Sequence, residues 1–550
     1  MRQARRIVRV ICWLFAALLA ARERVGASAE YKPIVVVSAA SYEKLIADVR
    51  QFVDARIVTV ALELAGRAGN LAFDPRTLAP VSVDPRRPWG LVVESDGQAV
   101  SMYGFAPVTD LGLLLAGPVA AGRIQPPVEG VYQLALGGSK WYARQRGAWT
   151  VFSDSQDGLD DIPDEPAKIL EEVKHSTDLA VSVLFRSLLP EHRELARRWI
   201  TEGSYLVFPR EAGEGEIQHA LRQALANQLL LRAAALVEEG DALSAGISVD
   251  LKNRRLVADV DLTYLAATEM ANGLAAPSTT KTDFGGFMLP NAALTGIWTG
   301  EIARMPLHQI LTLCDAVLRQ LTPDARDRPE LTLWRTIRDA LMEESVDGAV
   351  TVFLQPRGSI LAIGGYVSDG AKVERNLLAA AKAFGNVGAA GKAPTWTRDA
   401  GRYQDVRFHT LSIPLDVNAD NDAHLSQMFG DSMELVIGVD EHHLYAAVGK
   451  QPMSFLKQAL RQARSRGSGR QPPIRFSLSL ARCVRFLAET SPEADRGDLV
   501  QLADVLERSG GRDRVNLHAI PIKHGMHIRL EVDEAAMRSL TLLGHLGRRK

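Results

Sequence analysis

Cysteine is scarce in this chain, which has three among its 550 residues. Cys12 lies in an N-terminal apolar run, so Cys314 and Cys483 remain for the rest of the protein. Two cysteines cannot build the disulfide framework of a small secreted domain, and both lie in apolar, helix-like surroundings. The pattern favours free thiols, with one bridge between the halves as the alternative.

Motifs for catalysis and cofactor binding are also missing. The chain contains no G-x-S-x-G, H-E-x-x-H, C-x-x-C or G-x-G-x-x-G. Residues 385–393 differ from a P-loop, because the first glycine is one residue out of place and Ala393 stands where Ser or Thr must contact magnesium. No catalytic or cofactor-binding residue is therefore predicted. A Ser-His-Asp site assembled from distant residues would leave no such motif, so an enzyme is not excluded.

An excess of charge of one sign is absent, with 64 Lys and Arg against 65 Asp and Glu. The first 29 residues hold six Arg and one Glu, so the rest holds 64 − 6 = 58 basic and 65 − 1 = 64 acidic groups. A net charge of 58 − 64 = −6 gives no bulk attraction for nucleic acid or anionic lipid. After the leader, no apolar run reaches the ~20 residues that a membrane-spanning helix needs.

The N-terminus has the three parts of a secretory signal peptide. Arginines precede the apolar run Val10–Ala21, and Ala27-Ser28-Ala29 forms a small-x-small cleavage site. We therefore predict a signal peptide over 1–29 and export to the periplasm or cell envelope. The charged insert Arg22–Arg24 lengthens the region before the cleavage site, so an uncleaved membrane anchor is the alternative.

Two segments predict β-hairpins with the same plan. Arg87–Asp110 has two apolar runs around an Asp-Gly turn, and Asp347–Asp369 has two runs around Pro-Arg-Gly. Gly90 matches Gly348 at an offset of 258 residues, and Asp110 matches Asp369 at 259. Two later strands match at 295 and the closing hairpins match at about 272, so the offset changes only where loops absorb insertions.

These matches predict a duplicated α+β fold. The first copy covers 30–270, a Gly-, Pro- and Ser-rich linker covers 271–290, and the second copy covers 291–550. Consecutive hairpins favour antiparallel sheets over a doubly wound parallel one. We expect two similar tandem domains, each an antiparallel sheet with helices packed on one face.

Several segments resemble an uncharacterised family of exported proteins from planctomycete bacteria. They are DPRRPWG (84–90), YGFAPVTD (103–110), GAWTVFSDS (147–155) and MFGDSMELVIGVDEHHLYAAVG (428–449). The shared features are turn glycines, a tryptophan before a strand and an aspartate before a helix. The resemblance implies export and tandem α+β domains, and it implies no activity or catalytic residue.

One segment has the spacing of a calcium-binding loop. The candidate ligands are Asp416, Asn418, Asp420 and Asp422. Gln427 stands where such a loop has a bidentate Glu, and a strand precedes the segment instead of a helix. The alternative is a polar connection in which Asp422 caps the next helix, and the sequence favours it.

Other polar clusters favour structural interpretations. Asp154–Glu165 concentrates acidic residues without alternating ligands, which is typical of a solvated loop. His442 and His443 are neighbours on a predicted strand and point to opposite faces, so they cannot share one ion. The histidines His518, His524 and His527 surround a predicted hairpin turn without suitably spaced cysteine or carboxylate ligands.

The sequence thus favours an exported, non-catalytic envelope protein. We expect it to bind a protein or ligand through its sheet faces or through a groove between the domains. One alternative is a carrier of lipid or another apolar ligand, and another is a hydrolase with a dispersed active site.

Overall fold

The computed structural model describes residues 31–52, 80–96, 100–120, 124–136, 139–172, 177–203, 216–300, 338–339, 346–356, 358–384, 395–415, 429, 432–466, 470–491 and 493–539. The predicted leader, Cys314 and the segment 385–393 lie outside them. Within them, no helix is both long and apolar enough to cross a bilayer. Cys483 is a free thiol.

The chain divides into two compact units. Unit 1 comprises Met1–Glu202, Ala233–Leu265 and Gly544–Lys550, and unit 2 comprises Gly203–Arg232 and Ala266–Leu543. The helix α8 (Glu216–Glu239) begins in unit 2, and its residues from Ala233 onward belong to unit 1.

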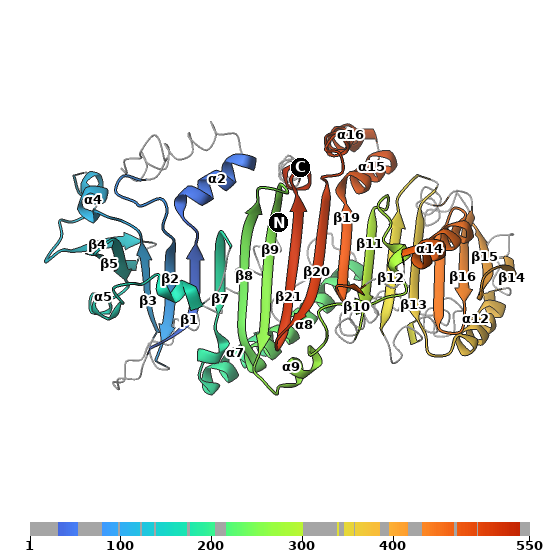
Figure 1. Cartoon of the computed structure of the whole chain (residues 1–550), viewed down its shortest axis with the longest axis horizontal. Helices are drawn as coiled ribbons and strands as arrows, with labels where there is room; N and C mark the ends of the chain where they lie inside the picture. Colours follow the sequence, from blue (N-terminus) through green and yellow to red (C-terminus); the bar gives the residue numbers. More distant parts are fainter. Residues whose placement is uncertain are drawn as a thin grey trace. The chain divides into compact units, whose positions relative to one another are not determined.

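Unit 1 is built on an antiparallel sheet with the strand order β4-β5-β6-β3-β2-β1-β7-β8-β9 (Figure 1). Its strands are β1 (Lys32–Ala39), β2 (Trp89–Ser95), β3 (Val100–Ala106), β4 (Val131–Leu136), β5 (Ser139–Arg146), β6 (Trp149–Ser153), β7 (Leu179–Val183), β8 (Gly240–Asp250) and β9 (Arg255–Tyr264). Its helices include α2 (Tyr42–Phe52), α4 (Leu111–Ala120), α5 (Gly158–Asp161), α6 (Lys168–Glu172), η1 (Phe185–Ser187) and α7 (Pro190–Gly203).

Unit 2 is built on an antiparallel sheet with the strand order β14-β15-β16-β17-β13-β12-β11-β19-β20-β21 (Figure 1). Its strands are β11 (Leu294–Thr299), β12 (Asp347–Phe353), β13 (Ile360–Tyr366), β14 (Thr395–Tyr403), β15 (Val406–Pro414), β16 (Ser432–Val439), β17 (His443–Gly449), β19 (Ile474–Ser479), β20 (Arg514–Ile522) and β21 (Gly525–Asp533). Its helices include α9 (Glu269–Gly273), η3 (Gly285–Phe287), α12 (Gly370–Phe384), α14 (Pro452–Arg466), α15 (Leu480–Thr490) and α16 (Glu493–Glu507), and β10 (Thr280–Lys281) pairs with β18 (Arg470–Gln471).

The structure confirms a mixed helix and sheet fold with antiparallel strands. Both predicted hairpins form, because Ser95 pairs with Val100 in β2–β3 and Phe353 pairs with Ile360 in β12–β13. Local turn signals and alternating apolar residues are sufficient to bring neighbouring strands together in this way.

The expectation that helices cover one face of each sheet is wrong. In unit 2, Val436 packs in the cluster that includes α14, whereas its neighbour Ile437 packs in the cluster that includes α12. In unit 1, Val151 packs with Leu159 of α5, whereas Phe152 packs with residues of α4. Adjacent strand residues point to opposite faces, so helices lie on both faces of each sheet.

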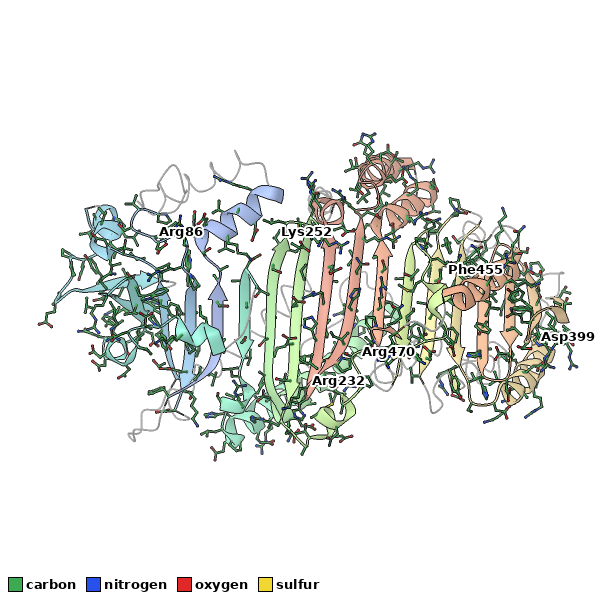
Figure 2. All side chains as sticks on the ribbon, viewed as in Figure 1. Arg86, Arg232, Lys252, Asp399, Phe455 and Arg470 are labelled. Carbon is green, nitrogen blue, oxygen red and sulfur yellow. The ribbon has the colours of Figure 1, made fainter. Side chains whose placement is uncertain are left out.

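The segment 271–290, predicted as a linker, contributes to the core of unit 2. Phe284 and Phe287 are fully buried and pack against Tyr445 and the helix α14, which Figure 2 marks by Phe455. The Gly-, Pro- and Ser-rich composition does predict irregular backbone. Two large aromatic side chains within it nevertheless make it a packed part of the fold.

Candidate functional site

The predicted calcium ligands Asp416, Asn418, Asp420 and Asp422 lie outside the described residues. The acidic segment Asp154–Glu165 forms ion pairs: Asp160 lies 2.7 Å from Arg144, and Asp164 lies 3.5 Å from Arg146. Among the described residues, one group combines three His or carboxylate ligands that could converge on an ion, and it consists of Glu374, Asp399 and His409.

The predicted hairpin at the end of unit 2 is confirmed. His524 lies in the turn between β20 and β21 with a left-handed φ of 57°. His527 is opposite Ile520 and His518 is opposite Arg529 in the ladder.

His443 lies near the core of unit 2 between two carboxylates, Asp440 and Asp283. Asp440 directly follows β16, in the turn that leads to β17. Its Oδ1 accepts hydrogen bonds from the backbone N–H groups of His442 and His443 at 2.9 and 2.8 Å. The same oxygen lies 2.9 Å from His443 Nδ1. An aspartate that binds the backbone two and three residues onward is typical of a tight turn, and here it also orients the imidazole.

A second carboxylate faces the other nitrogen of the ring. His443 Nε2 lies 3.5 Å from Asp283 Oδ2. The backbone N–H of Asp283 donates to Asp347 at 3.1 Å, and the hydroxyl of Thr282 donates to Asp347 at 2.7 Å. These contacts attach the core segment, which we define as Thr282–Leu289, to the strands β12 and β17.

Burial and charge shift the acid–base properties of this constellation. Burial raises the pKa of Asp347 to about 6, although hydrogen bonds from Thr282 and Asp283 oppose the shift. Burial alone would lower the pKa of His443, but Asp440 and Asp283 outweigh it, so the pKa lies above its usual 6.5. Protonated His443 is therefore a partly buried cation between two carboxylates.

Aromatic rings surround the His443 imidazole. The ring centroids of Phe284, Tyr445 and Tyr366 lie 5.7, 5.9 and 6.3 Å from its centroid. Phe284 and Tyr366 meet the imidazole edge-to-face, and Tyr445 stacks on it. Both nitrogens of His443 face carboxylates, not a hydroxyl or thiol, so this histidine does not form the nucleophile–base pair of a hydrolase.

The group Glu374, Asp399 and His409 brings together three elements of unit 2. Glu374 comes from α12, Asp399 from β14 and His409 from β15, and Figure 2 marks Asp399 near the end of the unit. The sequence does not display this group, because the three residues come from different elements and none belongs to a motif.

Unit 1 exposes an apolar sheet face on β7 and β8. Leu179, Val181 and Ile247 are 47%, 38% and 46% exposed. Leu179 pairs directly with Ile247, and Val181 follows two residues after Leu179, so all three side chains lie on one face.

No protein-family model, curated protein or solved structure matches this chain.

Proposed function

We propose that this is an exported, non-catalytic envelope protein that binds a protein partner through the apolar β7–β8 face of unit 1. The observation that carries the proposal is the exposure of Leu179, Val181 and Ile247 side by side. An isolated exposed apolar side chain is ordinary, whereas a contiguous group on a regular surface is typical of an interaction site.

A sheet face exposed to solvent usually carries polar side chains, whereas on β7 and β8 the exposed face carries apolar ones. The partners of the exposed face in the ladder are apolar, since Val181 pairs with both Val37 and Ala245. On the opposite face Ser182 is fully buried, and its hydroxyl lies 2.9 Å from that of Ser244. Side chains suited to a core thus face outward, which a partner surface would explain.

A protein partner suits this face better than a lipid does. Directly paired side chains on antiparallel strands make a broad, shallow surface, whereas a carried lipid needs a concave site that encloses most of its chain. We therefore expect the partner to present apolar side chains from a helix or sheet. A lipid carrier is the second candidate, and the experiment below separates the two.

The N-terminal sequence supports export. The arginines before Val10–Ala21 and the small residues at Ala27–Ala29 suit a secretory leader, and the resemblance to exported planctomycete proteins agrees with it. An envelope location also fits an apolar surface that is kept for a partner encountered after secretion.

The two units are, in our proposal, copies of one ancestral domain. The central strands β6-β3-β2-β1-β7-β8-β9 of unit 1 follow the same order as β17-β13-β12-β11-β19-β20-β21 of unit 2. Asp110 and Asp369, at an offset of 369 − 110 = 259, each follow the third of these strands in sequence. Each accepts a hydrogen bond from the backbone N–H three residues onward at 2.8 Å.

The ladder registers support one offset of 259 from the first strand to these aspartates. With it, Ala39 opposite Trp89 corresponds to Trp298 opposite Gly348, so each copy pairs one tryptophan with one small residue. Gly90 then corresponds to Ala349, one residue from the match of Gly90 with Gly348 that the sequence suggested. A one-residue shift exchanges the two faces of a strand, and only the offset of 259 keeps both cores on the same face.

The pairing of the matched strands β3 and β13 with their neighbours β6 and β17 gives His443 a counterpart in unit 1. Phe105 pairs with Val151 and Gly364 pairs with Tyr445, so His443 occupies the position of Trp149. Trp149 packs edge-to-face on Phe105 at 5.6 Å, and His443 packs edge-to-face on Phe284 at 5.7 Å. Phe284 fills the space left by Gly364, where a Cβ would lie 2.6 Å from its ring. The His443 constellation is then an acquisition of the second copy.

A photo-crosslinking amino acid at Val181 tests the proposed partner surface. Expressed in the native host, the variant is expected to give one defined crosslinked protein, identified by mass spectrometry. The matched control carries the same amino acid at Lys140, an exposed position on β5. A Val181→Asp variant is expected to abolish recovery of that partner while the fold, followed by circular dichroism, is kept.

The outcomes separate the candidates. Crosslinking to lipid, with lipid that co-purifies with the wild type and is lost in Val181→Asp, would favour the carrier. Equal products at Val181 and Lys140 would contradict a specific protein interface on this face.

A further inference from the structure

Strand alternation places two polar residues of β15 beneath α12. Val406 and Phe408 point into the core cluster that includes α14, so Arg407 and His409 point to the opposite face. There they meet Glu374, which is only 5% exposed although it carries a carboxylate. His409 is 1% exposed and stacks on Trp396 with ring planes 12° apart.

The contacts of Glu374 leave one of its oxygens available. Arg407 Nη2 donates to Oε2, while Oε1 lies 3.2 Å from His409 Nε2. Neither Oε1 nor Nε2 makes a hydrogen bond of acceptable geometry, although both atoms are buried. Two buried polar atoms that are close together without bonding to each other are costly, and a shared third partner would satisfy both.

The third group comes from a distorted part of β14. The ladder between β14 and β15 is irregular between Thr397 and Gly401, and Asp399 within it has a left-handed φ of 49°. Its carboxylate is 60% exposed, and the three ligand atoms of this group all lie within 4.8 Å of one another. An irregular strand can direct a side chain toward a site that a regular strand would miss.

We propose that Glu374 Oε1, His409 Nε2 and the Asp399 carboxylate bind one divalent transition-metal ion of the zinc class. Neighbouring ligands of a tetrahedral zinc ion lie roughly 3.3 Å apart when their bonds are about 2.0–2.1 Å long, which agrees with the separation of 3.2 Å between Oε1 and Nε2. An imidazole among the ligands favours zinc-class metals over calcium and magnesium, which prefer oxygen. Exposed Asp399 leaves the metal open to solvent on one side.

Arg407 and the backbone N–H of Asp399 determine which atoms of Glu374 and His409 can bind the metal. Arg407 holds Oε2, so Glu374 offers a single oxygen to the metal. The backbone N–H of Asp399 donates to His409 Nδ1 at 3.2 Å, so the proton of the neutral ring lies on Nε2. A metal at Nε2 moves that proton to Nδ1 and breaks the bond to Asp399.

Isothermal titration of the chelator-treated full chain with zinc chloride tests the proposal. The expected result is one ion per chain, with cobalt giving visible absorption bands of a protein-bound site. Asp399→Asn keeps the contacts of Glu374 with Arg407 and His409 and should weaken zinc binding at least tenfold. Asp405→Asn, an exposed aspartate in the turn between β14 and β15, is the matched control and should bind as the wild type does.

His409→Gln provides a second test, with circular dichroism reporting whether the variant folds. Zinc should also change the exchange rate of the Asp399 amide, since its hydrogen bond is lost on binding. Absence of stoichiometric binding, or equal affinity in the wild type and Asp399→Asn, would overturn the metal site and leave the proposed partner surface on unit 1 unaffected.

Discussion

At the residue scale, the groups that attach the core segment Thr282–Leu289 respond to pH in one direction. The pKa of Asp347 is about 6 in the folded chain, above its ordinary 3.8, so folding favours the protonated carboxyl. Its contribution to stability is therefore largest at low pH and falls as the pH rises from about 4 to 6. The pKa of His443 is raised above 6.5, so its contribution is complete below 6.5 and is lost as the pH rises through the folded value.

We predict that the core segment is held more firmly at pH 4–5 than at pH 8. A shift from 3.8 to about 6 corresponds to roughly 3 kcal/mol for Asp347. Hydrogen exchange of the amides of Asp283 and Phe284, corrected for intrinsic rates, measures the opening free energy. Asp347→Asn should flatten the fall between pH 4 and 6, and His443→Gln should flatten the fall above pH 6.5.

Asp347→Asn and His443→Gln test the two titrating groups separately. Each is expected to remove one part of the profile and to leave the other, because the two groups titrate in different ranges. A wild-type profile that stays flat from pH 4 to 8 would mean that neither group controls the segment. Although burial alone would raise the pKa of Asp440, the hydrogen bonds from His443 and the backbone hold it below its ordinary value. Below about pH 4, protonation of Asp440 therefore loosens the segment and opposes the gain in stability at low pH.

At the element scale, each unit starts a helix with an aspartate directly after a β-hairpin. Asp110 Oδ1 accepts from the N–H of Leu113 before α4, and Asp369 Oδ1 accepts from the N–H of Lys372 before α12. These bonds satisfy backbone donors that the first turn of a helix cannot pair internally. The negative charge also lies at the positive end of the helix dipole.

Replacing either aspartate by alanine should cost about 1 kcal/mol, since each change removes one helix cap. Chemical denaturation of Asp110→Ala and Asp369→Ala measures the two costs. Similar values would agree with equivalent elements in the two units. Asp110→Asn and Asp369→Asn serve as controls, because asparagine caps as well as aspartate does and should lose at most a few tenths of a kcal/mol. A cost well above 2 kcal/mol in one unit alone would show that its aspartate has a further role.

At the scale of the whole molecule, the N-terminal sequence predicts secretion. The sequence predicts cleavage after Ala29, because small residues at positions 27 and 29 suit signal peptidase. We expect the protein from the cell envelope of its host to begin at Glu30, as shown by N-terminal sequencing and intact mass. Replacement of Ala27 and Ala29 by larger residues should leave the leader attached. A wild-type chain that retains Met1 in the envelope fraction would favour the membrane anchor instead.

Each hairpin could be predicted because its information is local. The turn residues and the alternating apolar residues of β2–β3 and β12–β13 lie within about 20 residues, and tertiary contacts do not change their pairing. The helix starts at Asp110 and Asp369 follow from the same kind of short-range signal. The expectation that His442 and His443 are neighbours on one strand is wrong, because β17 begins at His443 and His442 lies in the turn before it. Both imidazole rings contact Tyr366.

The sites depend on contacts that the sequence does not display. Asp283 meets His443, and Glu374 meets His409, only after strands from distant parts of the chain pair in one sheet. The glycine- and proline-rich composition around Phe284 suggests a linker, and only the space above Gly364 makes it part of the core.

By itself, the sequence determined the α+β class, the antiparallel hairpins and the absence of a recognisable catalytic motif, because these depend on local periodicity and turn chemistry. Only the tertiary structure decided that helices cover both sheet faces, that Leu179, Val181 and Ile247 are exposed together, and which carboxylates surround each histidine. Long-range strand order decides which side chains share a face, and a shift of one residue in register would exchange the buried set for the exposed one.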